Sequence, residues 1–285
     1  MPELPEVHTI VQGINKSLLG YKILEVRDIK KKYNLLSQED IDSKVINATI
    51  VSAERLAKQI VLNLDNQHSL SFHLAMTGKL LLREPGHPQD KAERLVLNLI
   101  YQNGARELRF CDTRLFGKVK ILHSQEIEKS KNNFGLDPTT KEFNSKNFYN
   151  VIKSKNTSIK NLLMDQRKIA GLGNIYATDA LWLANINPTT HTSQITKEQA
   201  SKLLDSVISV LNEGIAHRGI SMRDYVDLYG EKGSHQNHFK VYQQSHCSRC
   251  QCEIQTVRIN GRATYFCPLC QPHKDKTLNK KISVN

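Results

Sequence analysis

The chain has 285 residues, which is enough for one large domain or two ordinary ones. Hydrophobic residues make up 39% of the chain and charged residues 24%, proportions typical of a globular protein. Because no run of about 18 apolar residues occurs, the composition excludes a transmembrane helix. The opening residues contain neither a basic nor an apolar segment, so we expect no secretory signal.

Basic side chains outnumber acidic ones, 40 to 28, which gives a formal net charge of +12. Residues 1–140 carry 20 basic and 17 acidic side chains, whereas residues 141–285 carry 20 and 11. A polyanion such as nucleic acid is the simplest partner for this chain, with phosphate binding mainly in the C-terminal half. The alternative is a basic surface that only keeps the protein soluble.

The N-terminal half begins with a predicted helix over residues 5–19, where apolar side chains recur at helical spacing. Residues 21–125 change to short apolar runs separated by turn signals, a pattern typical of strands. The clearest runs are 60–64, 69–74 and 95–100, and Asn103-Gly104 is a strong hairpin signal. We predict a β-sandwich with one leading helix over residues 1–130.

Polar residues 126–143 contain the predicted domain boundary, and we place a linker at 131–144. Helical periodicity returns over residues 145–228, with helices predicted near 145–154, 158–166, 173–184, 196–217 and 221–228. A Gly-, His- and Gln-rich loop at 229–245, a cysteine module at 246–271 and a basic tail at 272–285 complete the chain. The predicted fold class is α+β, with several domains.

Two pairs of cysteines near the C-terminus have the spacing of a metal site. They are Cys247-x2-Cys250 and Cys267-x2-Cys270, and 16 residues separate them. Without a secretory signal the expected compartment is reducing, which favours metal over disulfides. Two such pairs are typical of a zinc ribbon, in which four thiolates hold one Zn²⁺ and leave no open position, so the predicted ion is structural.

The stretch between the two pairs should form a hairpin, and its Arg-rich tip at 257–264 suits a phosphate or a nucleic-acid groove. An ordinary solvated turn is the alternative. Cys252 is a possible replacement ligand, although its spacing is more typical of a spare thiol. Cys111 lies in a strand pattern and is predicted to be a core residue.

Pro2 would become the first residue if Met1 is removed. Its secondary amine would then have a basicity close to that of an α-amino group, so a fraction is unprotonated and nucleophilic near neutral pH. Attack of such an amine on an aldehyde carbon gives an iminium, the Schiff-base route of covalent catalysis. Glu3, directly beside it, is a candidate general acid and base. Taken alone, Met-Pro-Glu is more simply explained as an ordinary N-terminal sequence without a catalytic role.

Five segments carry a further signal, in collinear order over residues 1–271. They are MPELPEV at 1–7, FHLAMTG at 72–78, DTRLFG at 112–117, MDQ at 164–166 followed by GLGNIY at 171–176, and the cysteine module with GRAT at 261–264. Together they resemble the motifs of the formamidopyrimidine-DNA glycosylase (Fpg/Nei) family. The third resembles a DNA-wedging loop and the fourth a helix–two-turn–helix element.

The resemblance implies a catalytic set of four residues. Pro2 would attack the anomeric carbon of the sugar, and Glu3 would move protons during base release and ring opening. Lys58 would hold phosphate and assist β-elimination, and Arg262 would clamp the phosphates around the lesion and assist δ-elimination. The implied activity is that of a bifunctional DNA glycosylase and AP lyase of base excision repair, removing 8-oxoguanine or formamidopyrimidine.

The resemblance also implies how DNA is held. Met76 and Phe116 would fill the space left by an everted nucleotide, and Arg114 would read the orphaned base. From their pattern alone, Met76 and Phe116 would be core residues. Asn174 would contact the DNA backbone after a glycine-rich turn at a helix N-terminus. Further backbone contacts are expected from His73, Lys155, Lys160 and Tyr242.

Three positions depart from the family pattern. His8 and Asp179 are expected to adjust the carboxylate network behind Pro2, and Ala92 would remove one histidine contact to DNA. The segment 221–244 corresponds to the loop that covers the everted base. Its unusual His, Gln and Lys content leaves the base preference open.

The expected partner is damaged double-stranded DNA, bound in a basic cleft by a monomer in the cytoplasm, at the nucleoid, with no membrane involved. Three alternatives stay open. One is an endonuclease VIII-like enzyme for oxidised pyrimidines, against which Leu4 and the zinc ribbon argue. The others are a non-catalytic protein that binds lesions or abasic sites, and a generic zinc-ribbon nucleic-acid binder.

Overall fold

The computed structural model describes residues 1–28, 36–102 and 104–273, and the chain divides into two compact units. The first unit combines residues 1–133 with residues 214–236. The second combines residues 134–213 with the chain from residue 237 onward.

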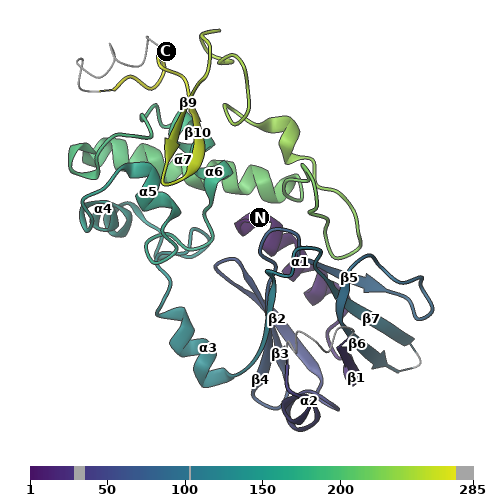
Figure 1. Cartoon of the computed structure of the whole chain (residues 1–285). Coiled ribbons are helices and arrows are strands. Elements are labelled where there is room, and N and C mark those ends of the chain that lie inside the picture. The colour runs from purple at the N-terminus through teal and green to yellow at the C-terminus, as the bar shows by residue number, and fades with distance from the viewer. Residues whose placement is uncertain (29–35, 103, 274–285) are drawn as a thin grey trace. The chain divides into compact units, whose positions relative to one another are not determined.

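In the described part of the first unit, eight strands form two four-stranded antiparallel sheets (Figure 1). One sheet has the order β1-β6-β7-β5 and the other β2-β3-β4-β8. The strands are β1 (Lys22–Asp28), β2 (Ile50–Leu56), β3 (Gln59–Leu64), β4 (His68–His73), β5 (Lys79–Arg83), β6 (Glu93–Tyr101), β7 (Gly104–Cys111) and β8 (Lys118–His123). The predicted β-sandwich is confirmed.

Apolar side chains from both sheets meet in a single core. Phe72 of β4 lies against Phe110 of β7, with ring centroids 6.0 Å apart. The leading helix α1 (Leu4–Ser17) buries Val7, Ile10 and Ile14 in the same core, which confirms the predicted helix. Burial of this one apolar stripe fixes the N-terminus of the chain against the sandwich.

The Asn103-Gly104 hairpin signal is confirmed by the strands on either side of it. Strands β6 and β7 pair with Tyr101 opposite Gly104, whereas Asn103 itself lies outside the described residues. Most of the predicted basic tail also lies outside them, from residue 274 onward.

Two short helices of the first unit were not predicted: α2 (Gln38–Lys44) and α3 (Ser124–Lys131). Each buries one apolar side chain, Ile41 in α2 and Ile127 in α3, which is too little for a periodic signal. Capping side chains start both helices: Ser37 accepts from the Asp40 amide, and His123 accepts from the Gln125 amide. Helix α3 includes the first residues of the polar segment 126–143, in which the domain boundary was predicted.

The predicted helix at 221–228 is wrong, because this segment contains no regular helix. Leu228 is fully buried beside Gly13 of α1, and its carbonyl accepts from the Leu82 amide at 2.8 Å. The apolar side chains whose spacing resembles a helical turn instead pack an irregular segment of bends and turns into the core of the first unit.

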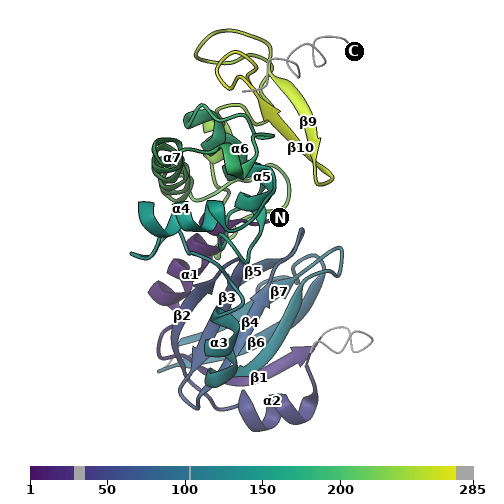
Figure 2. The same ribbon diagram turned by 90° about the vertical axis from the view of Figure 1, so that its left-hand side faces the viewer.

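The second unit contains the other predicted helices. They are α4 (Ser145–Lys153), α5 (Ile159–Met164), α6 (Asn174–Leu183) and α7 (Lys197–Ala216), the last of which runs on past residue 213. Strands β9 (Gln255–Ile259) and β10 (Arg262–Phe266) form the predicted hairpin, which lies beside α6 in Figure 2. Short 3-10 helices occur at Thr192–Gln194 and His235–His238. None of the helices in the described part of the chain is long and apolar enough to cross a bilayer.

The sandwich core provides a test of the fold. Phe72→Ala should lower the free energy of unfolding by about 3–5 kcal/mol, because it leaves a cavity between the two sheets. Val51→Ala, at a half-exposed position in β2, should change it by less than about 0.5 kcal/mol. Chemical unfolding followed by circular dichroism measures both, and similar losses in the two variants would contradict this core.

Candidate functional site

The start of α1 positions Pro2 and Glu3. Both residues are buried, and Glu3 is the N-cap, in an extended conformation. The Glu3 amide donates to Glu6 Oε2 at 2.6 Å, so the first turn of the helix holds the N-terminal segment. Pro5 suits the first turn because its missing N–H would have no partner there.

Glu6 is a functional candidate to which the sequence motifs assigned no role. Its side chain is 2% exposed, and its second oxygen, Oε1, accepts from the Ile220 amide at 2.9 Å. Gly219 has a φ of +83°, and a Cβ there would lie 2.7 Å from Glu6 Oε1. One carboxylate therefore connects the Pro2-Glu3 end of the chain to the segment 214–236. The Glu3-x-x-Glu6 spacing of a capping box was the available signal.

Lys58 lies in a two-residue turn between β2 and β3. Ala57, the first residue of this turn, has a φ of +53°, and its carbonyl accepts from Arg55 Nη1 at 3.0 Å. The side chains of Lys58 and His73 interact electrostatically: burial lowers the pKa of His73, and the ammonium groups of Lys118 and Lys58 lower it further. The structure thus brings two predicted DNA-binding residues together and adds Lys118, which no motif had indicated.

Met76, Arg114 and Phe116 form one surface cluster. Met76 is 46% exposed and Phe116 is 56% exposed, so the alternative that they are core residues is wrong. Arg114 Nη1 lies 3.3 Å from Met76 Sδ, and its guanidinium lies 5.1 Å from the centroid of the Phe116 ring. Two large apolar side chains held at a surface by an arginine are suited to insertion into a partner.

Asp112 organises the loops that present this cluster. It is 1% exposed and accepts from the Thr77 hydroxyl, from the Arg114 amide at 3.2 Å and from the Gly117 amide at 2.7 Å. A Cβ at Gly117 would lie 2.6 Å from the Phe110 ring, so the loop passes too close to the core for a side chain. Asp112 therefore ties the 112–117 loop to the turn after β4.

In the second unit, Arg262 and Asn174 lie on elements that are joined to each other. Arg262 is exposed and follows the tight turn Asn260-Gly261, whose two residues have φ values of 49° and 73°. Asn174 begins α6, and its Nδ2 donates to the carbonyl of Ala263 in β10 at 3.1 Å. This bond fixes the hairpin tip to the start of α6.

Lys160 requires a correction. Its side chain is completely buried, and its ammonium donates to the Asn174 carbonyl at 2.8 Å and to the Thr178 hydroxyl. A buried ammonium with these partners does not fit the expected direct contact with DNA; it fits a role in positioning Asn174. Lys155 remains exposed at the surface, where it pairs with Asp165 at 2.9 Å.

Asp179 and Tyr242 belong to a second organising contact. Asp179 is 1% exposed and accepts from the amides of residues 240, 241 and 242 at 3.0–3.1 Å. The Tyr242 ring packs edge-on against Tyr265 of β10, with centroids 5.1 Å apart. In the described part of the second unit Asp179 thus holds the chain that leads into the cysteine module. His8 is half-buried in α1.

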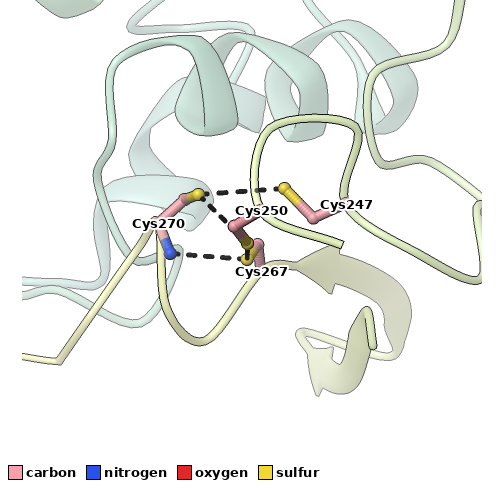
Figure 3. A group of neighbouring side chains, drawn as sticks. All are labelled: Cys247, Cys250, Cys267 and Cys270. Carbon is pink, nitrogen blue, oxygen red and sulfur yellow. Dashed lines mark hydrogen bonds between the residues drawn. The ribbon is translucent and has the colours of Figure 1, made fainter. Parts of the chain in front are cut away.

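The four cysteines of the two pairs converge, as Figure 3 shows. All four sulfurs lie within 4.8 Å of one another, with Cys250 Sγ 3.4 Å from Cys267 Sγ and Cys247 Sγ 3.8 Å from Cys270 Sγ. A Zn–S bond of about 2.3 Å in a tetrahedron requires sulfurs about 3.8 Å apart, so the donor set fits a metal ion. Cys252 is not a member of this group, and Cys111 is buried in the first unit, as predicted.

The Asp112 contacts lead to a prediction. Asp112→Ala should lower the free energy of unfolding by about 3 kcal/mol, because it leaves buried donors without an acceptor. The amides of Arg114 and Gly117 should also exchange hydrogen faster. Thr113→Ala, at the exposed neighbouring position, is the control and should change neither. Equal effects in the two variants would show that Asp112 does not organise the loop.

Comparisons with known proteins cover both units. The family model of the formamidopyrimidine-DNA glycosylase N-terminal domain matches residues 1–119, and that of the formamidopyrimidine-DNA glycosylase H2TH domain matches residues 134–226. The formamidopyrimidine-DNA glycosylase of Chloroflexus aurantiacus is 37% identical over 274 residues, which are 95% of this chain and 98% of that protein. The Streptococcus mutans enzyme of the same name is 35% identical over 275 residues, 95% and 99% of the two chains.

Solved structures agree with the sequence relatives. The complex between Lactococcus lactis Fpg and DNA containing an abasic site superposes with a TM-score of 0.86 at 32% identity. The match covers 95% of this chain and 100% of that one. A MutM complex with DNA containing carbocyclic 8-oxo-G matches with the same TM-score, at 30% identity, and over the same shares of the two chains. The chain belongs to the formamidopyrimidine-DNA glycosylase family.

Proposed function

We propose that this protein is a bifunctional DNA glycosylase and AP lyase of base excision repair, acting on oxidised purines in double-stranded DNA. The observation that carries the proposal is the Pro2-Glu3 pair, held at the start of α1 by Glu6, in a chain that matches the family over 95% of its length. The named relatives suggest 8-oxoguanine and formamidopyrimidine as lesions. We infer a monomer that works in the bacterial cytoplasm, at the nucleoid.

The chemistry begins at Pro2 after Met1 has been removed. The neutral secondary amine attacks C1′ of the damaged nucleotide and the C1′–N bond breaks, with the proton from the Pro2 nitrogen going to the departing base. Glu3 then supplies a proton to O4′ as the C1′–O4′ bond of the sugar ring breaks. The product is an iminium between Pro2 and C1′. Loss of a proton from C2′ then permits β-elimination of the 3′ phosphate. Subsequent δ-elimination releases the 5′ phosphate and leaves a one-nucleotide gap.

Reaction at C1′ requires the nucleotide to leave the base stack, which costs a few kcal/mol. Met76 and Phe116 would offset part of this cost by filling the space, with Arg114 against the unpaired base. Lys58, His73, Asn174, Lys155 and Tyr242 would bind the DNA backbone. Arg262 would bind the phosphates beside the lesion and assist δ-elimination, whereas Lys160 would position Asn174 from within the second unit.

We further propose that the four cysteines hold one structural Zn²⁺. Four thiolates leave no position for substrate, so the ion would stabilise the module that carries the β9–β10 hairpin and would take no part in the reaction. Arg262 would owe its fixed position to this module and to the bond between Asn174 and Ala263.

The zinc proposal predicts unequal effects of two cysteine substitutions. Cys270→Ser should lose most of the bound zinc and weaken DNA binding at least tenfold, because the ribbon depends on the metal for its fold. Cys252→Ser should keep one zinc per chain and near-normal binding. Elemental analysis and a DNA titration measure the two effects. Loss of zinc in Cys252→Ser, or its full retention in Cys270→Ser, would refute the assignment.

The enzymatic proposal is tested with Glu3→Gln and a panel of lesion duplexes. Excision of 8-oxoguanine opposite cytosine should fall by about 10²–10⁴-fold, whereas binding to an abasic-site analogue should change little. Glu39→Gln, at an exposed position in α2, is the control and should leave both unchanged. Faster turnover of oxidised pyrimidines by the wild type would favour an endonuclease VIII-like enzyme, and binding without turnover would favour a lesion-binding protein.

A further inference from the structure

One end of the sheet β2-β3-β4-β8, beside the Ala57-Lys58 turn, carries a row of adjacent polar side chains. Gln59 of β3 lies opposite His73 of β4, and His73 lies opposite Lys118 of β8. Directly opposed residues of antiparallel strands place their side chains on the same face, with Cβ atoms about 4.5–5.5 Å apart. Lys58 immediately precedes Gln59, so lysines approach His73 from two directions.

Electrostatics agree with this register. The ammonium groups of both lysines interact with the His73 imidazole, although Lys58 comes from the turn between β2 and β3 and Lys118 from β8. Lys118 is exposed and has no ion pair among the residues that the structure describes. Lys131 of α3, by contrast, pairs with Glu54 of β2 at 3.3 Å and with Glu128 at 2.7 Å. The two lysines thus bring two positive charges to one imidazole, and an anion bound between them would relieve their mutual repulsion.

We propose that Lys118 is a phosphate-binding residue, which acts with Lys58 and His73 to hold one backbone phosphate of the bound DNA. The proposal rests on the proposed function and adds a third side chain to a site for which the motifs indicated two. A lysine supplies a point charge on a flexible stem, and an imidazole N–H supplies a directed donor. The ligand is a phosphodiester group, so Lys118 should affect affinity for all duplexes and leave lesion preference unchanged.

Lys120 provides a matched control. It lies two residues further along β8, on the same face, opposite Ser71, and it is exposed like Lys118. Lys120→Ala removes the same charge from the same strand, but at a position two residues away from the one opposite His73. A difference in DNA affinity between the two variants therefore reflects the position of the lost lysine and not the change in net charge.

The experiment measures the affinity of the full-length protein for a duplex with a tetrahydrofuran abasic analogue, over a range of salt concentrations. Lys118→Ala should weaken binding roughly five- to tenfold and lower the slope of log K against log salt by about 0.9, the value for one phosphate contact. Lys118→Arg should restore most of both. Lys120→Ala should change affinity by less than about twofold. Single methylphosphonate linkages along the lesion strand then locate the phosphate, because the neutral linkage at that position should weaken Lys118→Ala less than it weakens the wild type.

Equal effects of Lys118→Ala and Lys120→Ala, or no linkage whose effect depends on Lys118, would overturn the proposal. Excision of 8-oxoguanine by the wild type, measured in parallel, separates this failure from failure of the proposed function. If the wild type excises the base and Lys118→Ala binds normally, only the Lys118 site is refuted. If the wild type does not excise, the same salt slopes on an undamaged duplex still decide whether Lys118 holds phosphate.

Discussion

A nucleophile at the end of a chain must be held in place, because chain termini lose order more easily than any other part of a fold. In this protein the Glu6 carboxylate provides that restraint. One oxygen accepts from the Glu3 amide at 2.6 Å, and the other accepts from the Ile220 amide at 2.9 Å. Because α1 is anchored by its apolar stripe in the sandwich core, Pro2 and Glu3 at its start are held in a fixed position by that core.

Elsewhere in both units, too, buried polar side chains hold a loop or helix end in place while exposed side chains of the same segment face solvent. Buried polar side chains, Asp112, Lys160 and Asp179, satisfy backbone groups of loops and helix ends and meet no solvent. Exposed side chains that those loops present, such as Phe116 and Arg262, are left for the partner. A buried charge with complete hydrogen bonds holds a loop in one conformation, because breaking the arrangement would leave an unpaired group in a low dielectric. Binding can then proceed without the cost of ordering the loop first.

The sequence predicted much of this architecture because its signals are local. Short apolar runs between turn signals predicted the strands, and helical spacing predicted α1 and α4–α7. The spacing of the cysteines predicted a group whose sulfurs do converge. The collinear motifs placed Met76, Arg114 and Phe116 in one cluster, against the expectation from hydrophobicity alone.

What could not be predicted depends on tertiary partners. The spacing of Tyr225 and Leu228 resembles a helix, but these side chains lie in an irregular segment and are buried in the core of the first unit. Lys160 looked like a surface cation because a buried lysine has no sequence signature. In the fold its ammonium donates to the Asn174 carbonyl and to the Thr178 hydroxyl. Lys118 was passed over because its relation to His73 is a cross-strand register between residues 45 positions apart.

The central claim is that the amine of Pro2 becomes bonded to C1′ of a damaged nucleotide. Borohydride reduces an iminium to a stable amine, so it should trap the protein on a duplex with 8-oxoguanine opposite cytosine, and peptide mapping should place the link at Pro2. An abasic duplex should give the same link. No crosslink with either duplex, from protein whose N-terminus is confirmed to be Pro2, would contradict the account.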